Sequence, residues 1–231
     1  MSDDHSERAI SAYGSQLINT PNIDRIASEG VLFTNSFVGN SICGPSRASM
    51  LTGKHSHING FTDNHSSFDG HQPTYPQYLQ KAGYQTAVVG KWHLQSNPVG
   101  FDYWEILRGQ GHYYSPEFIT NRPNKDSVIK QIKDATGNII ETEYENTYQG
   151  AYATDKIGDL AIDFLDSRDK SKPFALIYNH KAPHRNWMPN VDDLGVIDTA
   201  DLTVPDNFYD DYAGRIAAQR QQLEIDDKHL S

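Results

Sequence analysis

The sequence predicts an α/β fold, in which helices alternate with buried strands. Two short apolar segments, residues 84–89 and 173–178, are predicted to be buried strands. Each follows a helical pattern, over residues 74–82 and residues 154–165, and Gly83 is placed to end the first of these helices. The length of 231 residues fits one α/β domain or part of a larger one.

The first part of the chain is predicted to hold a helix, a strand and a second helix. Thr20 precedes a proline and an apolar stripe, which predicts the N-cap of a short amphipathic helix that ends before Gly30. Residues 31–37 are predicted to form a strand. Pro45 suits the first turn of the second helix, and Gly53 can end it.

The remaining elements follow in order. Residues 128–133 and 139–144 flank a glycine-containing turn and predict a hairpin, which we expect to be peripheral. Thr154 is expected to cap the helix over residues 154–165, and a polar helical stretch is expected near residues 214–225. The aromatic segment 100–118 suits either a loop that packs sugar rings or part of the core.

Composition excludes several classes of function. The formal net charge is −10, with 30 acidic and 20 basic residues, and no Lys/Arg-rich run is present, which argues against a nucleic-acid partner. No apolar run approaches the roughly 18 residues that a membrane span needs. One cysteine excludes an internal disulfide. An anionic substrate would therefore need a locally positive pocket.

Cys43, the single cysteine, lies where the second helix is predicted to begin. Backbone N–H groups and the helix macrodipole at that end favour an anion or a developing negative charge. A free cysteine is more often a small buried core residue. Placement alone leaves both interpretations open.

Two further groups of residues could bind a ligand. Asp3 and Asp4 offer adjacent hard oxygen ligands for Ca²⁺ or Mg²⁺, although a solvated tail is the more ordinary explanation for such a pair. Lys91 and His93 are two residues apart at the end of a predicted strand, so they share a face and can reach one ligand, unless both are ordinary surface residues. Four histidines in residues 55–71 lack zinc-site spacing and favour a polar loop.

The motif C-G-P-S-R at residues 43–47, followed by L-T-G at residues 51–53, resembles the signature of the type I sulfatases. Four further segments are similar to that family: the aspartates at residues 3–4, residues 20–37, G-K-W-H at residues 90–93, and A-P-H at residues 182–184. The resemblance covers nearly all 231 residues in order.

The resemblance implies a reaction and the residues that perform it. Cys43 would be oxidised after translation to formylglycine, whose hydrated aldehyde attacks sulfur and later releases sulfate by collapse. Arg47 would anchor that nucleophile, Lys91 would contact it and the sulfate, and His93 would be a partner of the hydrated aldehyde. His184 would contact the sulfate.

The resemblance also implies a metal site, a fold and partners. Asp3 and Asp4, with position 43, would hold Ca²⁺, with Mg²⁺ less favoured. The implied fold is the alkaline-phosphatase-like α/β sandwich, a mixed β-sheet flanked by helices. Residues 1–231 are expected to be an N-terminal fragment of one catalytic domain, without its first core strand and its C-terminal part, and with no second complete domain. The fragment alone is expected to be inactive.

The implied partners are a sulfated carbohydrate and a formylglycine-generating maturation enzyme. Three segments are most similar in sequence to bacterial N-acetylglucosamine-6-sulfatase-like and mucin-desulfating enzymes: residues 109–118, 180–187 and 205–215. Such enzymes suggest a periplasmic or exported protein of a bacterium, a compartment on which the sequence itself is silent. The alternatives are a phosphomonoester or phosphonate hydrolase of the same superfamily, a catalytically dead glycan-binding fragment, and a non-functional gene fragment.

Overall fold

A computed structural model describes residues 1–198, 202, 204 and 206–216. Within those residues the chain forms five α-helices: α1 (Pro21–Glu29), α2 (Cys43–Thr52), α3 (Ser56–Asn59), α4 (Tyr75–Lys81) and α5 (Ala153–Ser167). Three short 3₁₀ helices add to them: η1 (Glu7–Ala9), η2 (Ser11–Tyr13) and η3 (Val191–Asp193). No helix of this described part is long and apolar enough to cross a bilayer.

The strands of the described chain form one mixed sheet. They are β1 (Gln85–Lys91), β2 (Tyr103–Leu107), β3 (Glu117–Thr120), β4 (Val128–Lys133), β5 (Ile139–Thr147) and β6 (Phe174–Asn179), in the spatial order β4-β5-β3-β2-β1-β6. The central strand β1 runs parallel to β2 and β6, with Val88 opposite Trp104 on one side and Ile177 on the other. β3 pairs antiparallel with β2 and β5, and β4 and β5 form the expected hairpin.

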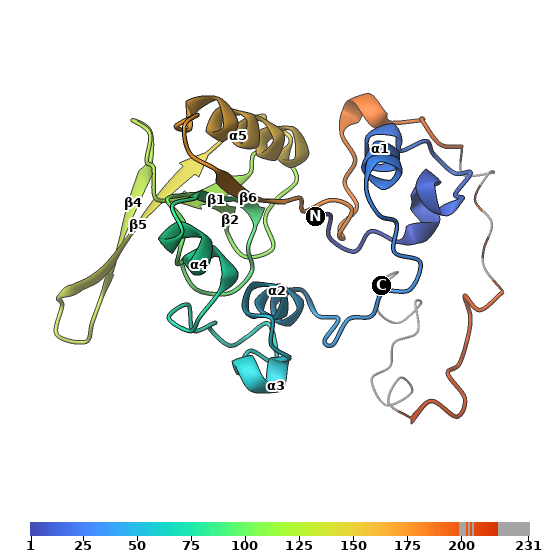
Figure 1. The fold of residues 1–231 in the computed structure, drawn as a ribbon, viewed down its shortest axis with the longest axis horizontal. Coiled ribbons are helices and arrows are strands. Elements are labelled where there is room, and N and C mark those ends of the chain that lie inside the picture. Colours follow the sequence, from blue (N-terminus) through green and yellow to red (C-terminus); the bar gives the residue numbers. More distant parts are fainter. Residues whose placement is uncertain (199–201, 203, 205, 217–231) are drawn as a thin grey trace.

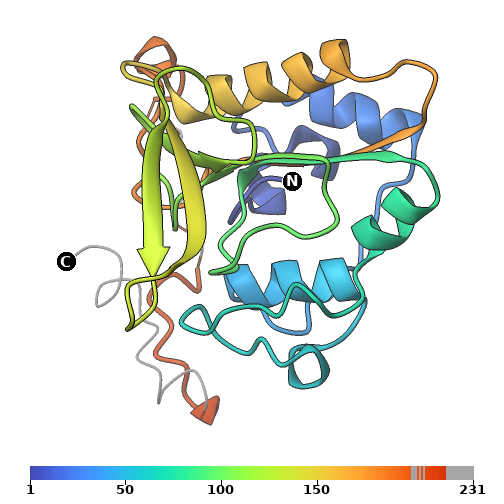
Figure 2. The ribbon, with the colours of Figure 1, turned by 90° about the vertical axis from the view of Figure 1, so that its left-hand side faces the viewer.

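Helices cover both faces of this sheet, as Figures 1 and 2 show. Side chains of a strand alternate between its two faces, and β1 follows this rule. Val88 packs with Ala48 and Leu51 of α2 on one face, whereas Val89 packs with Ile157 of α5 on the other. The α/β sandwich is therefore built from two apolar layers, one on each side of β1.

The carboxyl ends of β1 and β6 meet at one edge of the sheet, because these strands are parallel. The N-terminal residue lies at this edge, where Met1 accepts a hydrogen bond from the backbone N–H of His180. In open α/β sheets, ligands bind at the carboxyl edge of the strands. Asp3 and the last residue of β1, Lys91, are thereby brought together across 88 residues of sequence.

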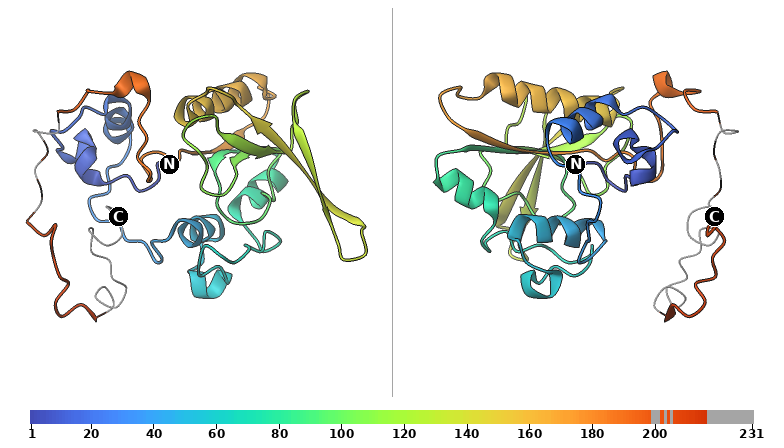
Figure 3. Two further views of the ribbon diagram at one scale, coloured as in Figure 1. Left: turned by 180° about the vertical axis from the view of Figure 1, so that it is seen from behind. Right: turned by 45° about the vertical axis from the view of Figure 1, so that its right-hand side comes forward.

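Two local predictions were wrong. Residues 31–37 form no strand, and Phe33 and Phe37 expose 67% and 96% of their surface, because no neighbouring strand of the described chain pairs with this segment. Figure 3 shows α1 and its flanking segments set apart from the layered sheet. The N-cap of α5 is Tyr152 rather than Thr154, and its side chain makes no capping hydrogen bond. Most of residues 214–225 lies outside the described residues.

Candidate active site

Cys43 is the first residue of α2, and its half-buried thiol lies at the N-terminal end of that helix. The next backbone N–H, that of Gly44, donates to Asn64 Oδ1 at 2.9 Å. A Cβ atom at Gly44 would lie 2.6 Å from the Phe61 ring and 2.9 Å from the carbonyl oxygen of His93. Only glycine fits this close approach, and it brings the start of α2 directly against the segment that follows β1.

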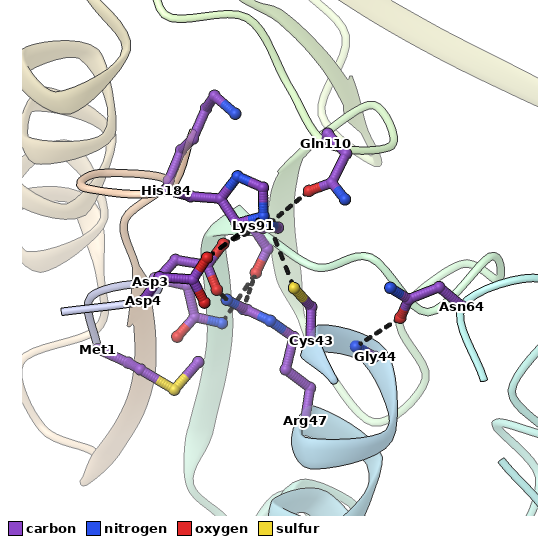
Figure 4. A network of polar contacts seen from close by, with 12 residues as sticks. Met1, Asp3, Asp4, Cys43, Gly44, Arg47, Asn64, Lys91, Gln110 and His184 are labelled. Carbon is purple, nitrogen blue, oxygen red and sulfur yellow. Dashed lines mark hydrogen bonds and ion pairs between the residues drawn. The ribbon is translucent and has the colours of Figure 1, made fainter. Parts of the chain in front are cut away.

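Lys91, the last residue of β1, lies at the centre of the site (Figure 4). Its fully buried ammonium donates to an Asp3 carboxylate oxygen and, at 2.6 Å, to Gln110 Oε1. Its Nζ atom is 3.8 Å from the Cys43 sulfur. A buried charge is costly unless it is paired and hydrogen-bonded. These partners therefore hold the ammonium in one place, close to the sulfur.

Arg47 is buried one helical turn after Cys43. Its guanidinium donates to the backbone carbonyl of Lys91 at 2.6 Å and to Asp3 Oδ1 at 3.2 Å. The amide of Asn179, the last residue of β6, donates to the same Lys91 carbonyl at 3.0 Å. Arg47 thus ties α2, β1 and the N-terminal segment to one another.

The two predicted metal-ligating aspartates have different surroundings. Asp3 is only 6% exposed. Burial by itself would raise its pKa, but the hydrogen bond and charge of Lys91, with the charge of Arg47, lower that pKa overall, so the carboxylate is ionised. The side chain of Asp4 is 59% exposed, and its Oδ2 atom lies 3.6 Å from His184 Nε2. Asp4 therefore stands at the rim of the site.

His184 approaches from the segment after β6 and is 6% exposed. Its Nδ1 atom lies 2.6 Å from the carbonyl oxygen of Arg185. A carbonyl oxygen only accepts, so Nδ1 carries a proton and Nε2 faces the site. Ligand atoms of Asp3, Cys43 and His184 all lie within 4.8 Å of one another, the one such cluster among the described residues.

His93 is buried beside the site, but within the described chain its Nδ1 atom has no hydrogen-bond partner. Burial lowers its pKa to about 4, and the positive charges of Lys91 and Arg47 act in the same direction. The imidazole is therefore neutral near pH 7. The backbone carbonyl of His93 lies against Gly44, the residue after the predicted nucleophile. Within the described residues, no hydrogen bond joins the His93 imidazole to Cys43.

A sequence model of the family described as Sulfatase matches residues 1–226. The chain belongs to the sulfatase family. It is 50% identical over 225 residues to an N-acetylglucosamine-6-O-sulfatase of Bacteroides thetaiotaomicron, a match that covers 96% of this sulfatase chain and 36% of the relative. It is 30% identical over 245 residues to human N-acetylgalactosamine-6-sulfatase, covering 97% of this chain and 46% of that one.

A solved structure of a protein in complex with its substrate, D-glucosamine-2-N,6-O-disulfate, has the same fold. The TM-score is 0.81 at 50% identity, and the match covers 96% of this chain and 41% of that chain. The alkaline-phosphatase-like architecture predicted from the sulfatase motifs is confirmed. This sulfatase chain spans less than half the length of the relatives it matches.

Sequence reasoning missed two polar residues of this sulfatase site, Gln110 and Lys181. Gln110 lies between two glycines shortly after β2 and accepts from Lys91. Lys181 is 5% exposed, and burial lowers its pKa, as does the charge of Lys91. Both residues follow the carboxyl ends of strands that flank β1, and that position is the signal that could have identified them.

The aromatic residues of segment 100–118 belong mainly to the core of the sulfatase chain. Tyr103, Trp104 and Tyr113 are 6%, 9% and 4% exposed. Buried rings cannot present a face to a sugar without rearrangement. The alternative of a sugar-packing loop therefore does not hold for these three residues.

Proposed function

We propose that this sulfatase-family protein hydrolyses sulfate esters of a sugar, with a nucleophile made from Cys43. The observation that carries the proposal is the convergence of Cys43, Asp3 and His184 within 4.8 Å, beside the buried ammonium of Lys91. A thiol, a carboxylate, an imidazole and an ammonium from four separate segments have little reason to meet unless they act on one ligand.

The thiol is placed for oxidation to formylglycine, the modification that the family resemblance implies. Cys43 is half-buried rather than enclosed, and Pro45 and Arg47 complete the C-x-P-x-R motif. One hydroxyl oxygen of the hydrated aldehyde attacks sulfur and displaces the sugar oxygen. The second hydroxyl then loses its proton and becomes the aldehyde C=O again, as the bond between carbon and the sulfated oxygen breaks and sulfate leaves. Lys91 and the helix start of α2 favour negative charge at that position.

The donor set fits one side of a Ca²⁺ site. Asp3 provides an ionised carboxylate, and a hydrated aldehyde at position 43 would replace sulfur by oxygen, which a hard cation prefers. Asp4 lies close enough to His184 to turn toward the same point. A bound divalent cation would polarise a sulfate oxygen.

The chain's own cations would bind and orient the sulfate. Lys91 and Arg47 are rigid and desolvated, so their charges act strongly on a group beside Cys43. His184 presents Nε2 to the same space, since Arg185 holds the Nδ1 proton. This positive local environment supports an anionic substrate, although the chain carries a formal net charge of −10.

For the substrate we propose a 6-O-sulfated N-acetylglucosamine unit of a glycan. The support is the 50% identity with a relative named N-acetylglucosamine-6-O-sulfatase. A second support is a solved structure of the same fold, 50% identical in sequence to this chain, which holds its substrate D-glucosamine-2-N,6-O-disulfate.

The deciding experiment uses what we call the extended protein, these 231 residues with any coding sequence that flanks them, expressed with a formylglycine-generating system. Peptide mass spectrometry should find the aldehyde at position 43. Sulfate release should follow from 6-O-sulfated N-acetylglucosamine, and should exceed phosphate release from the matching phosphate ester. Faster hydrolysis of the phosphate ester would show a phosphatase. Sugar binding without turnover, in protein whose conversion is verified, would show a dead glycan-binding protein.

A further inference from the structure

The segment that carries His184 is tied down by tyrosine hydroxyls. Three hydroxyls donate to three of its backbone carbonyl oxygens: Tyr113 to His184, Tyr152 to Met188 at 2.9 Å, and Tyr114 to Pro189 at 2.6 Å. The side chain of Asn190 adds a hydrogen bond to Asp155 at 3.1 Å. Residues 184–190 have no regular secondary structure, so these side-chain bonds replace a backbone ladder.

The three tyrosines are themselves held in a rigid group. The rings of Tyr113 and Tyr152 stack with centroids 5.9 Å apart, and Tyr114 and Tyr152 form an antiparallel β-bridge. The Tyr113 carbonyl accepts from the N–H of Ala153, at the start of α5, at 2.7 Å. Burial raises the pKa of Tyr113 to about 12, so its hydroxyl remains a donor. The group therefore transfers the rigidity of α5 to the segment of His184.

Tyr113 binds the carbonyl of the residue whose ring reaches the active site. That carbonyl belongs to the peptide between His184 and Arg185, so its position sets where the Arg185 carbonyl lies relative to the imidazole. The Arg185 carbonyl accepts from His184 Nδ1 at 2.6 Å and from Lys181 Nζ at 3.3 Å. The Tyr113 hydroxyl thus acts on the hydrogen bond that places the imidazole proton.

We propose that Tyr113 is a positioning residue that keeps the proton of His184 on Nδ1. Nε2, whose nearest carboxylate is Asp4 Oδ2 at 3.6 Å, is then left without a proton beside the cluster of Asp3 and Cys43. The consequence for catalysis rests on the proposed function, but the placement of the proton does not. Loss of the Tyr113 hydroxyl frees the peptide after His184, and the imidazole then samples both tautomers and more than one orientation. Tyr152 and Tyr114 act farther along the same segment and have smaller effects.

The first test measures the tautomer itself. The extended protein is labelled with ¹⁵N at histidine, and the His184 signals are identified by their loss in His184→Gln. We expect the Nδ1–H form in the parent, because the Arg185 carbonyl accepts from Nδ1, and a mixture of both forms in Tyr113→Phe. Tyr148→Phe is the matched control, because its hydroxyl binds Glu105 rather than this segment. It should leave the His184 signals unchanged.

The second test measures function in the same variants. In Tyr113→Phe, the inhibition constant of inorganic sulfate should rise about 10-fold and kcat should fall by a similar factor, as for other partners that orient a ligand. Tyr148→Phe should keep both values. If the parent releases no sulfate, the proposed function is wrong, while the tautomer measurement still decides the role of Tyr113.

An unchanged His184 tautomer in folded Tyr113→Phe would overturn the inference, as would an equal change in Tyr148→Phe. If Tyr113→Phe does not fold, Tyr152→Phe replaces it, since that variant removes the 2.9 Å bond to Met188 and leaves the Tyr113 hydroxyl in place. A partial shift toward the mixed tautomer in Tyr152→Phe then supports the inference, and no shift overturns it.

Discussion

Asp3 and Glu105 are both buried carboxylates, 6% and 3% exposed, but their partners differ in charge. Asp3 is bound by two cations, Lys91 and Arg47. Three neutral groups donate to Glu105: the hydroxyls of Tyr103 and Tyr148 and the side-chain amide of Asn146. Asp3 lines a cavity of about 140 Å³ that Cys43 also lines. Glu105 lies within β2 and lines a different cavity of about 230 Å³, on the α5 side of the sheet.

The difference separates two uses of a buried acid. Neutral donors satisfy the lone pairs of Glu105, and the group contributes to the packing of the sheet without offering charge to a ligand. At Asp3, the carboxylate balances two cations beside an open cavity, and an anion placed there would meet the same cations. Changing each group should therefore affect activity in one case and stability in the other.

The largest effect is expected for Cys43→Ala in the extended protein. Removing the thiol removes the precursor of the nucleophile, so sulfate release should fall to the uncatalysed rate. The side chain is only half-buried, so the melting temperature should change little. Calorimetry and a sulfate assay, with Tyr148→Phe as an active control, measure both. Turnover that persists in Cys43→Ala would place the nucleophile elsewhere.

The next effect is expected for Asp3→Asn. This change leaves Lys91 and Arg47 without their buried counter-charge and removes an ionised ligand for the proposed cation. The rate should fall about 100-fold or more, and the free energy of unfolding should drop by about 3 kcal/mol. Calcium titration with a sulfate assay measures metal affinity and rate, and chemical denaturation measures the free energy of unfolding. Unchanged metal affinity and rate in Asp3→Asn would make the aspartate purely structural.

Glu105→Gln is the counterpart and should affect stability alone. The new amide NH₂ faces hydroxyl and amide groups that now donate to the carboxylate, so hydrogen bonds are lost inside the protein. We expect the free energy of unfolding to fall by about 1–3 kcal/mol, with kcat/KM within about 2-fold of the parent. A selective loss of activity in this variant would contradict the division between the two acids.

His93 sharpens the comparison, because it is a buried titratable group held neutral rather than charged. Burial and the nearby positive charges lower its pKa in the folded chain to about 4, from an ordinary value of about 6.5. Between these values the unfolded chain binds more protons, so stability should decrease as the pH falls from 6.5 toward 4. His93→Gln should flatten that decrease by up to about 2 kcal/mol, measured by urea denaturation at several pH values. The matched control is His71→Gln, at an exposed position, which should leave the dependence of the free energy of unfolding on pH as it is in the parent.

Much of the layered core follows from the sequence, because it depends on local periodicity. The structure contains the two strands predicted at residues 84–89 and 173–178, and the helix predicted before each of them. It also contains the predicted hairpin, and all of these elements lie within a few residues of their predicted limits. The failed strand at residues 31–37 has strand-like residues as well. A strand also needs a neighbour to pair with, and local composition does not reveal whether one is present.

The motifs around Cys43 and Lys91 likewise identified the family from the sequence, and with it the residues expected to act. Tertiary structure decided how these residues meet. It placed Asp3, Cys43 and His184 in one cluster with Asp4 at its rim, added Gln110 and Lys181, and tied His184 to Tyr113. Local sequence determines which residues can do chemistry. Their distances depend on how the parallel strands align and on which buried charges must find partners, and both are properties of the folded chain.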